Sequence, residues 1–224
     1  MPTIRPPHLR SISCVAMLGI GAWTSLPLQL QAQSAKVLFC PLEGNSSLGS
    51  SQALDRLKNR TFPPSPSEMN RHVTMSALVA PGSDSHSFNA SDGARITGYV
   101  VDVKVGGIES VNCEATDVDD RDTRIDLTLQ PNNAGGATRV AVDVTPRLRA
   151  VMRQRGIDWT TPTLRRQLTG RWIEVTGWLL YDEGTQSTAH KTNAAKEQTP
   201  RASAWEIYPV TKLRLAKAPR RPNP

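Results

Sequence analysis

Apolar and polar residues alternate along several short segments after residue 93, which is typical of β-strands that bury one face. In the first segment Val101 and Val103 share one face, whereas Asp102 lies on the opposite face. We therefore predict strands within residues 94–107, 122–129, 138–145, 171–182 and 202–215. The residues expected to meet in one core are Val101, Val103, Ile125, Leu127, Val142, Val175 and Ile207.

Two basic helices are predicted between the third and fourth strands. Thr145 is a good N-cap, and Pro146 stands at the first helical position, where its missing N–H costs nothing. Gly156 can end this helix in the left-handed conformation. The step Thr161–Pro162 begins a second helix in the same way, and Gly170 ends it.

The predicted element order is strand, strand, strand, helical connection, strand, strand. This is the order of an OB-fold, a five-stranded Greek-key barrel. We therefore predict a mostly β protein, with an OB-fold-like barrel over residues 94–216 and the helical connection between strands 3 and 4. An open sheet with the same element order is the alternative. Pro209 predicts a bulge or a sheet edge in the last strand, because proline cannot donate a ladder hydrogen bond.

The segment before the barrel, residues 35–93, carries little periodic signal and is predicted to be an irregular, partly helical N-terminal extension. Residues 50–60 predict a short helix with Ala53, Leu54 and Leu57 on one side. Several prolines then interrupt the helical pattern, because each proline fixes φ and removes a donor. One or two further helical turns are expected before Pro81. After the barrel, residues 217–224 are predicted to form a basic tail without fixed structure.

Residues 1–34 predict a signal peptide. Arg5 and Arg10 precede an apolar run that is too short to span a bilayer, and Ala32–Ser34 is a small-x-small cleavage site. A buried helix is the alternative. We therefore expect an exported protein, periplasmic or extracellular. Cys40 and Cys113 then remain in the mature chain, and an oxidising compartment permits a disulfide between them, with two free thiols as the alternative.

Four motifs stand out along the chain, namely GYVVDVKVGGIESVNC, VDVTPRLRAVM, GRWIEVTGWLLYD and WEIYPVT. In these motifs the chain resembles a group of uncharacterised secreted bacterial proteins with a predicted OB-fold. The resemblance implies the fold and the exported location, and no established activity. In that family histidines often stand at the positions of Glu114, Arg124 and Tyr208, which would suggest metal binding. This chain lacks those histidines, so the resemblance carries over no metal site and no cofactor.

Ligand-binding residues are expected in the two loops that OB-folds commonly use, here residues 109–122 and 183–201. The first loop is acidic, and several oxygens on one short loop suit a hard cation such as Ca²⁺. A solvated acidic loop is the simpler interpretation, because Arg121 stands where an EF-hand needs an oxygen. The candidate ligand-binding residues of the two loops are Asp119, Asp120, Asp122 and His190.

Two tryptophans of the predicted fourth strand form another candidate site. Trp172 and Trp178 share its outward face, with Glu174 and Thr176 between them. Such a pair could stack against sugar rings. Alternatively, a helix or the N-terminal extension covers both rings.

The chain is basic, with 27 Lys and Arg against 20 acidic residues and a formal net charge of +7. A basic surface attracts phosphate backbones or an anionic membrane surface. The Arg-rich helical connection is therefore an alternative site, for nucleic acid. Against this, Asp126 and Asp143 lie on the outward face of the second and third strands, which carries no aromatic ring to stack a base. The candidate nucleic-acid-binding residues are Arg149, Arg153, Arg165 and Arg166.

A catalytic site has little support in the sequence. No Ser or Cys stands in an elbow motif, and His72 and His86 lie in peripheral segments. We predict an exported, non-catalytic OB-fold module without cofactor or membrane span, which binds a protein or an oligosaccharide. Nucleic acid is the alternative partner, and an unusual hydrolase is a third possibility.

Overall fold

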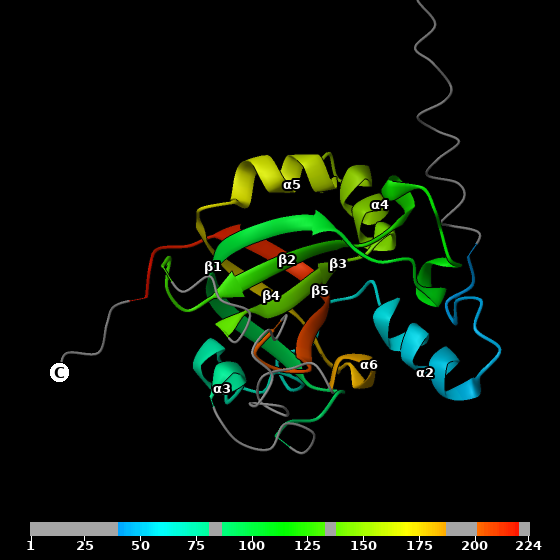
Figure 1. Ribbon diagram of the computed structural model, residues 1–224, viewed down its shortest axis with the longest axis horizontal. Helices are drawn as coiled ribbons and strands as arrows, with labels where there is room; N and C mark the ends of the chain where they lie inside the picture. Colours follow the sequence, from blue (N-terminus) through cyan, green and yellow to red (C-terminus); the bar gives the residue numbers. More distant parts are fainter. Residues whose placement is uncertain (1–39, 81–86, 133–137, 187–200, 220–224) are drawn as a thin grey trace, which may run out of the picture.

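The computed structural model describes residues 40–80, 87–132, 138–186 and 201–219, so the predicted signal peptide, His190 and the end of the basic tail lie outside the described residues. Five strands close into a barrel in the order β1-β2-β3-β5-β4 (Figure 1). β3 and β5 are parallel, and the other neighbouring pairs are antiparallel. The OB-fold-like barrel is thus confirmed, and the open sheet is not formed. The strands are β1 (Gly93–Val105), β2 (Thr123–Thr128), β3 (Val140–Val144), β4 (Trp172–Tyr181) and β5 (Trp205–Leu215).

The strand registers bring the predicted core residues together. Val142 of β3 pairs with Ile125 on one side and with Ile207 on the other. All three side chains are fully buried. The same cluster contains Val103, Leu127 and Val175.

Val101 does not belong to the core, contrary to the prediction. A register shift between Val100 and Asp102 marks a bulge in β1. A bulge adds one residue to a strand, so the alternation of inward and outward side chains changes phase there. Val100 and Val103 are therefore buried, whereas Val101 is only half-buried. The register of β4 with β5 also shifts around Pro209, as its presence in the strand predicted.

The helical connection lies across one end of the barrel (Figure 1). Thr145 caps the first helix as predicted, since its hydroxyl accepts a hydrogen bond from a backbone N–H in the first turn. The N-cap of the second helix is Thr160, one residue before the predicted Thr161, and it makes no side-chain cap bond. Asp158 stabilises the start of this helix instead, because its carboxylate accepts a hydrogen bond of 2.8 Å from the Thr160 N–H. The two helices are α4 (Pro146–Gln154) and α5 (Thr161–Leu168).

The N-terminal extension is tied to the β1–β2 loop by a disulfide between Cys40 and Cys113, as predicted, and their Cα atoms lie 5.8 Å apart. Its second helix lies at the barrel end opposite to α4 and α5 (Figure 1), where Met75 and Leu78 join the core. No helix in the described part of the chain is long and apolar enough to cross a membrane. The remaining elements are α2 (Gly49–Lys58), α3 (Met75–Val79), η1 (Ser110–Asn112), η2 (Val118–Asp120) and α6 (Glu183–Gln186).

α2 buries a charged side of the helix and not the apolar side that the sequence suggested. Asp55 and Lys58 are buried, whereas Ala53 is exposed. Asp55 accepts a hydrogen bond of 2.7 Å from the Ser110 hydroxyl. The helix docks against the polar β1–β2 loop and not against the apolar core, so its buried positions are polar.

Candidate functional site

OB-folds commonly bind ligands on the face of strands 2 and 3. Here the outer face of β2, β3 and β5 carries a layer of paired charges. Arg124 of β2 makes two hydrogen bonds of 3.1 and 3.0 Å to the Asp143 carboxylate of β3. Its guanidinium also lies 3.3 Å from Glu206 of β5, which Arg201 contacts at 2.6 Å. The Asp143 and Glu206 side chains are 2% and 1% exposed. The layer is therefore buried, and a ligand cannot reach its carboxylates without displacing protein.

The extension covers one end of this charged layer. Lys58 of α2 forms an ion pair of 2.7 Å with Glu109 and lies 4.9 Å from the centre of the Tyr208 ring. The Tyr208 hydroxyl donates a hydrogen bond to Oδ2 of Asp122. Burial, together with the negative charges of Glu109 and Asp143, raises the pKa of Asp122 to about 7. This end of the layer is thus a buried contact between the extension and the barrel.

The three candidate aspartates of the β1–β2 loop are not brought together into one site. Asp119 is exposed, whereas Asp120 and Asp122 are buried. Arg149 organises the loop by donating to the backbone carbonyls of Asp119 and Arg121 at 2.7 and 2.6 Å. Among the described residues, no group of three or more His, Cys, Asp or Glu side chains is placed to hold a metal ion. The loop therefore has a structural role in this fold.

One of the four arginines predicted to bind nucleic acid is buried. Arg149 is 5% exposed, because its guanidinium binds the β1–β2 loop and the Thr123 hydroxyl. Its assignment as a nucleic-acid contact was therefore wrong. Arg165 donates a hydrogen bond of 2.6 Å to the Val103 carbonyl, and Arg166 donates one to the Thr163 hydroxyl. The exposed arginines of the helical connection that were predicted to bind nucleic acid are Arg153, Arg165 and Arg166.

The two tryptophans of β4 do share the outward face, but the extension covers one of them. The Trp178 indole N–H donates a hydrogen bond of 2.9 Å to the Phe62 carbonyl. The Arg60 guanidinium lies 4.1 Å from the centre of the Trp178 ring, which is 2% exposed. Trp172, at the other end of the face, is half-buried and packs edge-on against Tyr99. Trp178 therefore cannot stack against a sugar ring, and Trp172 retains an accessible surface.

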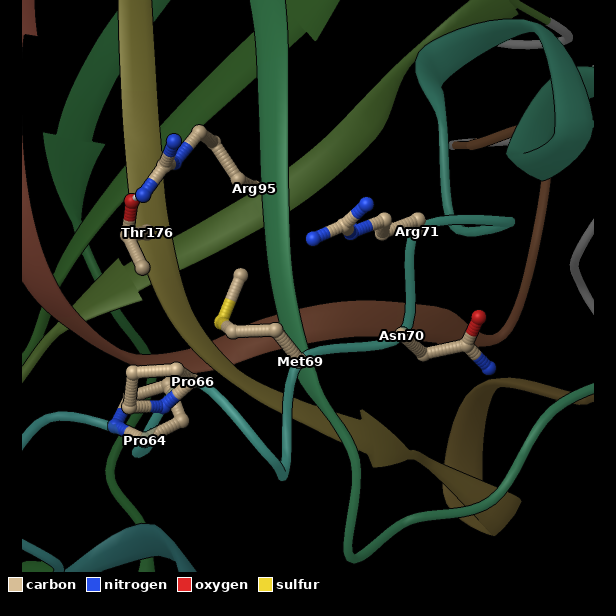
Figure 2. Close-up of a pocket in the computed structure, with 7 residues that line it drawn as sticks. All are labelled: Pro64, Pro66, Met69, Asn70, Arg71, Arg95 and Thr176. Atoms are coloured by element: carbon tan, nitrogen blue, oxygen red, sulfur yellow. Dashed lines mark hydrogen bonds between the residues drawn. The ribbon is translucent and has the colours of Figure 1, made fainter.

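A pocket of about 510 Å³ lies between the extension and this face of the barrel (Figure 2). We call residues 60–71, which connect α2 to α3, the strap. The strap pairs with the start of β1, since the Gly93 N–H donates to the Glu68 carbonyl and the Asn70 N–H donates to the Gly93 carbonyl, each at 2.8 Å. A volume in this range suits a small ligand or part of a larger one. The pocket is lined by Pro64, Pro66, Met69, Asn70, Arg71, Arg95 and Thr176.

Gly93 permits the close approach of the strap. A Cβ atom at this position would lie 2.4 Å from Cβ of Pro64 and 3.0 Å from the Met69 sulfur. Any larger residue would therefore push the strap away from β1 and change the shape of the pocket.

The lining of the pocket is cationic on one side and apolar on the other. Arg71 makes no hydrogen bond or ion pair with another described residue. Arg95 lies 3.8 Å from Glu174, outside the lining, and is 57% exposed. The Asn70 amide is fixed by a hydrogen bond of 2.8 Å to Asp92. The lining thus offers two guanidinium groups and no carboxylate, next to two proline rings and a methionine.

Sequence reasoning missed this pocket. Its walls come from the irregular strap, which has no periodic pattern, and from outward positions of β1 and β4. The available signals were the prolines of the strap and the glycine at the start of β1. No protein-family model matches the chain, and a search of the curated proteins finds no match. The resemblance to secreted bacterial OB-fold proteins therefore stays a prediction.

Proposed function

We propose that the protein is an exported, non-catalytic binding module, in which the strap and the barrel together bind a ligand that carries an anionic group. The observation that carries this proposal is the free guanidinium of Arg71 in a pocket whose lining has no acidic residue. Planar guanidinium groups bind carboxylates and related anions through paired hydrogen bonds. The proline and methionine side chains would contact the apolar parts of the same ligand.

The chemistry of the pocket supports binding over catalysis. Its lining offers charge, hydrogen bonds and apolar surface, and it contains no pair of side chains that could act as nucleophile and base. In the charged layer burial raises the pKa of the Asp143 and Glu206 carboxyls, but both carboxyls are paired with arginines and closed off from a ligand.

The disulfide supports the exported location, because such bonds persist in oxidising compartments. Nucleic acid is a weaker candidate partner, since Arg149 is buried and the β2–β3 face is already filled by ion pairs.

Thermal unfolding in the presence of acidic oligosaccharides, acidic peptides and their neutral counterparts tests the proposal. A ligand at a hundred times its dissociation constant stabilises the folded state by about 2.7 kcal/mol, which gives a readily measured rise in Tm. We expect acidic ligands alone to raise the Tm, and Arg71→Ala to abolish the rise. Arg155→Ala, an exposed arginine beyond α4, is the matched control. Equal stabilisation by neutral ligands, or none by acidic ones, would contradict the proposal.

A further inference from the structure

A second pocket, of about 400 Å³, lies on the same outer face of the barrel. Thr97 of β1 and Glu174 of β4 form its floor, and the end of β5 with the chain that follows it forms its wall. It is lined by Thr97, Glu174, Arg214, Leu215, Ala216, Lys217 and Pro219.

The two pockets are neighbours along the sheet. Arg95 pairs with Thr176 in the floor of the first pocket, and Thr97 pairs with Glu174 in the floor of the second. These are successive pairs on one face, so they lie about 6.7 Å apart along the strands. Arg95 reaches across this step to Glu174 at 3.8 Å. The two pockets therefore meet at this ion pair and together follow β1 and β4.

The combined surface has a surplus of positive charge. Its only acidic lining residue is Glu174, which Arg214 contacts at 2.9 Å. Arg71 in the first pocket and Lys217 in the second make no ion pair with another described residue. Two unneutralised cations at separate points along one face favour a ligand with repeated negative charges over a ligand with one.

The chemistry of the face favours a sugar chain over a peptide. Backbone groups of paired strands lie in the plane of the sheet and point to the neighbouring strands, so a ligand above the face meets side chains only. An extended peptide would leave its own amides poorly matched there. The hydroxyl of Thr97, which lines the second pocket, suits a ligand rich in hydroxyl groups, whereas the Thr176 hydroxyl already accepts a hydrogen bond from Arg95. One pair further along, Trp172 and Tyr99 offer aromatic surface on which the apolar face of a sugar ring can pack.

We propose, on the basis of the function inferred above, that the two pockets form one groove for a linear acidic oligosaccharide. The strap binds one end of the ligand through Arg71, and Lys217 binds a later acidic unit. The ligand lies over the Arg95–Glu174 ion pair and ends at Trp172. The groove lies on the opposite face of the barrel from the charged layer of β2, β3 and β5.

Calorimetric titration with oligogalacturonates of two, four and six units tests this inference, at an ionic strength of roughly 0.15 M to suppress non-specific attraction. We expect affinity to rise from the two-unit to the six-unit probe. Lys217→Ala should weaken binding of the six-unit probe about fivefold, as expected for the loss of one partly exposed charge contact. It should leave binding of the two-unit probe unchanged, whereas Arg71→Ala should weaken both. A fully methyl-esterified six-unit probe and the Arg155→Ala variant are the controls.

The outcomes separate this inference from the proposed function. If all three acids bind equally and Lys217→Ala changes nothing, the single-pocket function stands and the groove is refuted. If an oligoglutamate of six residues binds more tightly than the six-unit sugar, the ligand is an acidic peptide and the sugar assignment is wrong. If neither the sugars nor the peptide bind, both proposals fail.

Discussion

Replacing Asp122 with Asn is expected to stabilise the protein, and the gain in stability should grow as the pH rises. The Asp122 side chain is buried, and one of its carboxylate oxygens accepts the Tyr208 hydroxyl hydrogen. Its other oxygen has no hydrogen-bond partner among the described residues. Asparagine keeps the shape and one acceptor, and it removes the charge.

The size of the expected stabilisation follows from the raised pKa of Asp122. Burial, and then the negative charges of Glu109 and Asp143, raise the pKa of Asp122 from 3.8 to about 7, in spite of the nearby cations Lys58 and Arg149. A carboxyl group with a raised pKa binds more protons in the folded than in the unfolded state, so stability is lost as pH rises between these two values. A shift of about three pKa units corresponds to about 4 kcal/mol at pH 8, and to only about 0.6 kcal/mol near pH 4.

Urea unfolding at pH 5 and pH 8, without reductant, measures this difference. We expect the free energy of unfolding of Asp122→Asn to exceed that of the wild type at pH 8 by up to about 4 kcal/mol, with a smaller excess at pH 5. Asp119→Asn is the control, because its side chain is exposed on the same loop. The reasoning is refuted if the excess is no larger at pH 8 than at pH 5.

Three further substitutions test the fold and the strap, all by urea unfolding. Arg149→Ala should lower the free energy of unfolding by about 3 kcal/mol, because the buried Thr123 hydroxyl and two loop carbonyls lose their donor, whereas exposed Arg155→Ala should lower it by less than about 0.5 kcal/mol. Gly93→Ala should lower the free energy of unfolding by about 1–3 kcal/mol and weaken ligand binding. Its control is Gly49→Ala, in which the added Cβ would meet no atom within 4 Å, so stability and binding should not change. Val142→Asp should unfold the domain, since an unpaired carboxylate in the core costs several kcal/mol; a stable variant would show that the core is elsewhere.

The barrel could be predicted because its local signals agree with one another. Alternating residues place Ile125, Val142 and Ile207 on inward faces, and these residues meet. Thr145 and Gly156 mark the ends of α4 through their own chemistry, a side-chain cap and a positive φ of 75°. Both kinds of signal act over a few residues, so they can be read along the chain.

The errors arise where distant segments meet. The alternation in β1 fails at Val101, because the bulge is set by pairing with β2. Asp126 and Asp143 lie on outward positions as predicted, yet both are buried. Their burial depends on cations that other segments supply, as when Lys104 of β1 contacts Asp126 at 2.7 Å. The pocket has the same origin, since neither the strap nor the barrel forms it alone.

The disulfide has a consequence for how this protein can be altered. It joins residues separated by 73 positions, so α2, the strap, α3 and β1 all belong to one covalently closed loop. The free energy of closing a loop changes only slowly with its length. Lengthening residues 60–71 therefore adds little loop-closure free energy, while the disulfide ties the extension to the barrel and the Gly93 pairing holds the strap against β1. The strap is thus a segment of the pocket wall in which insertions can change the ligand preference while the barrel sequence stays the same.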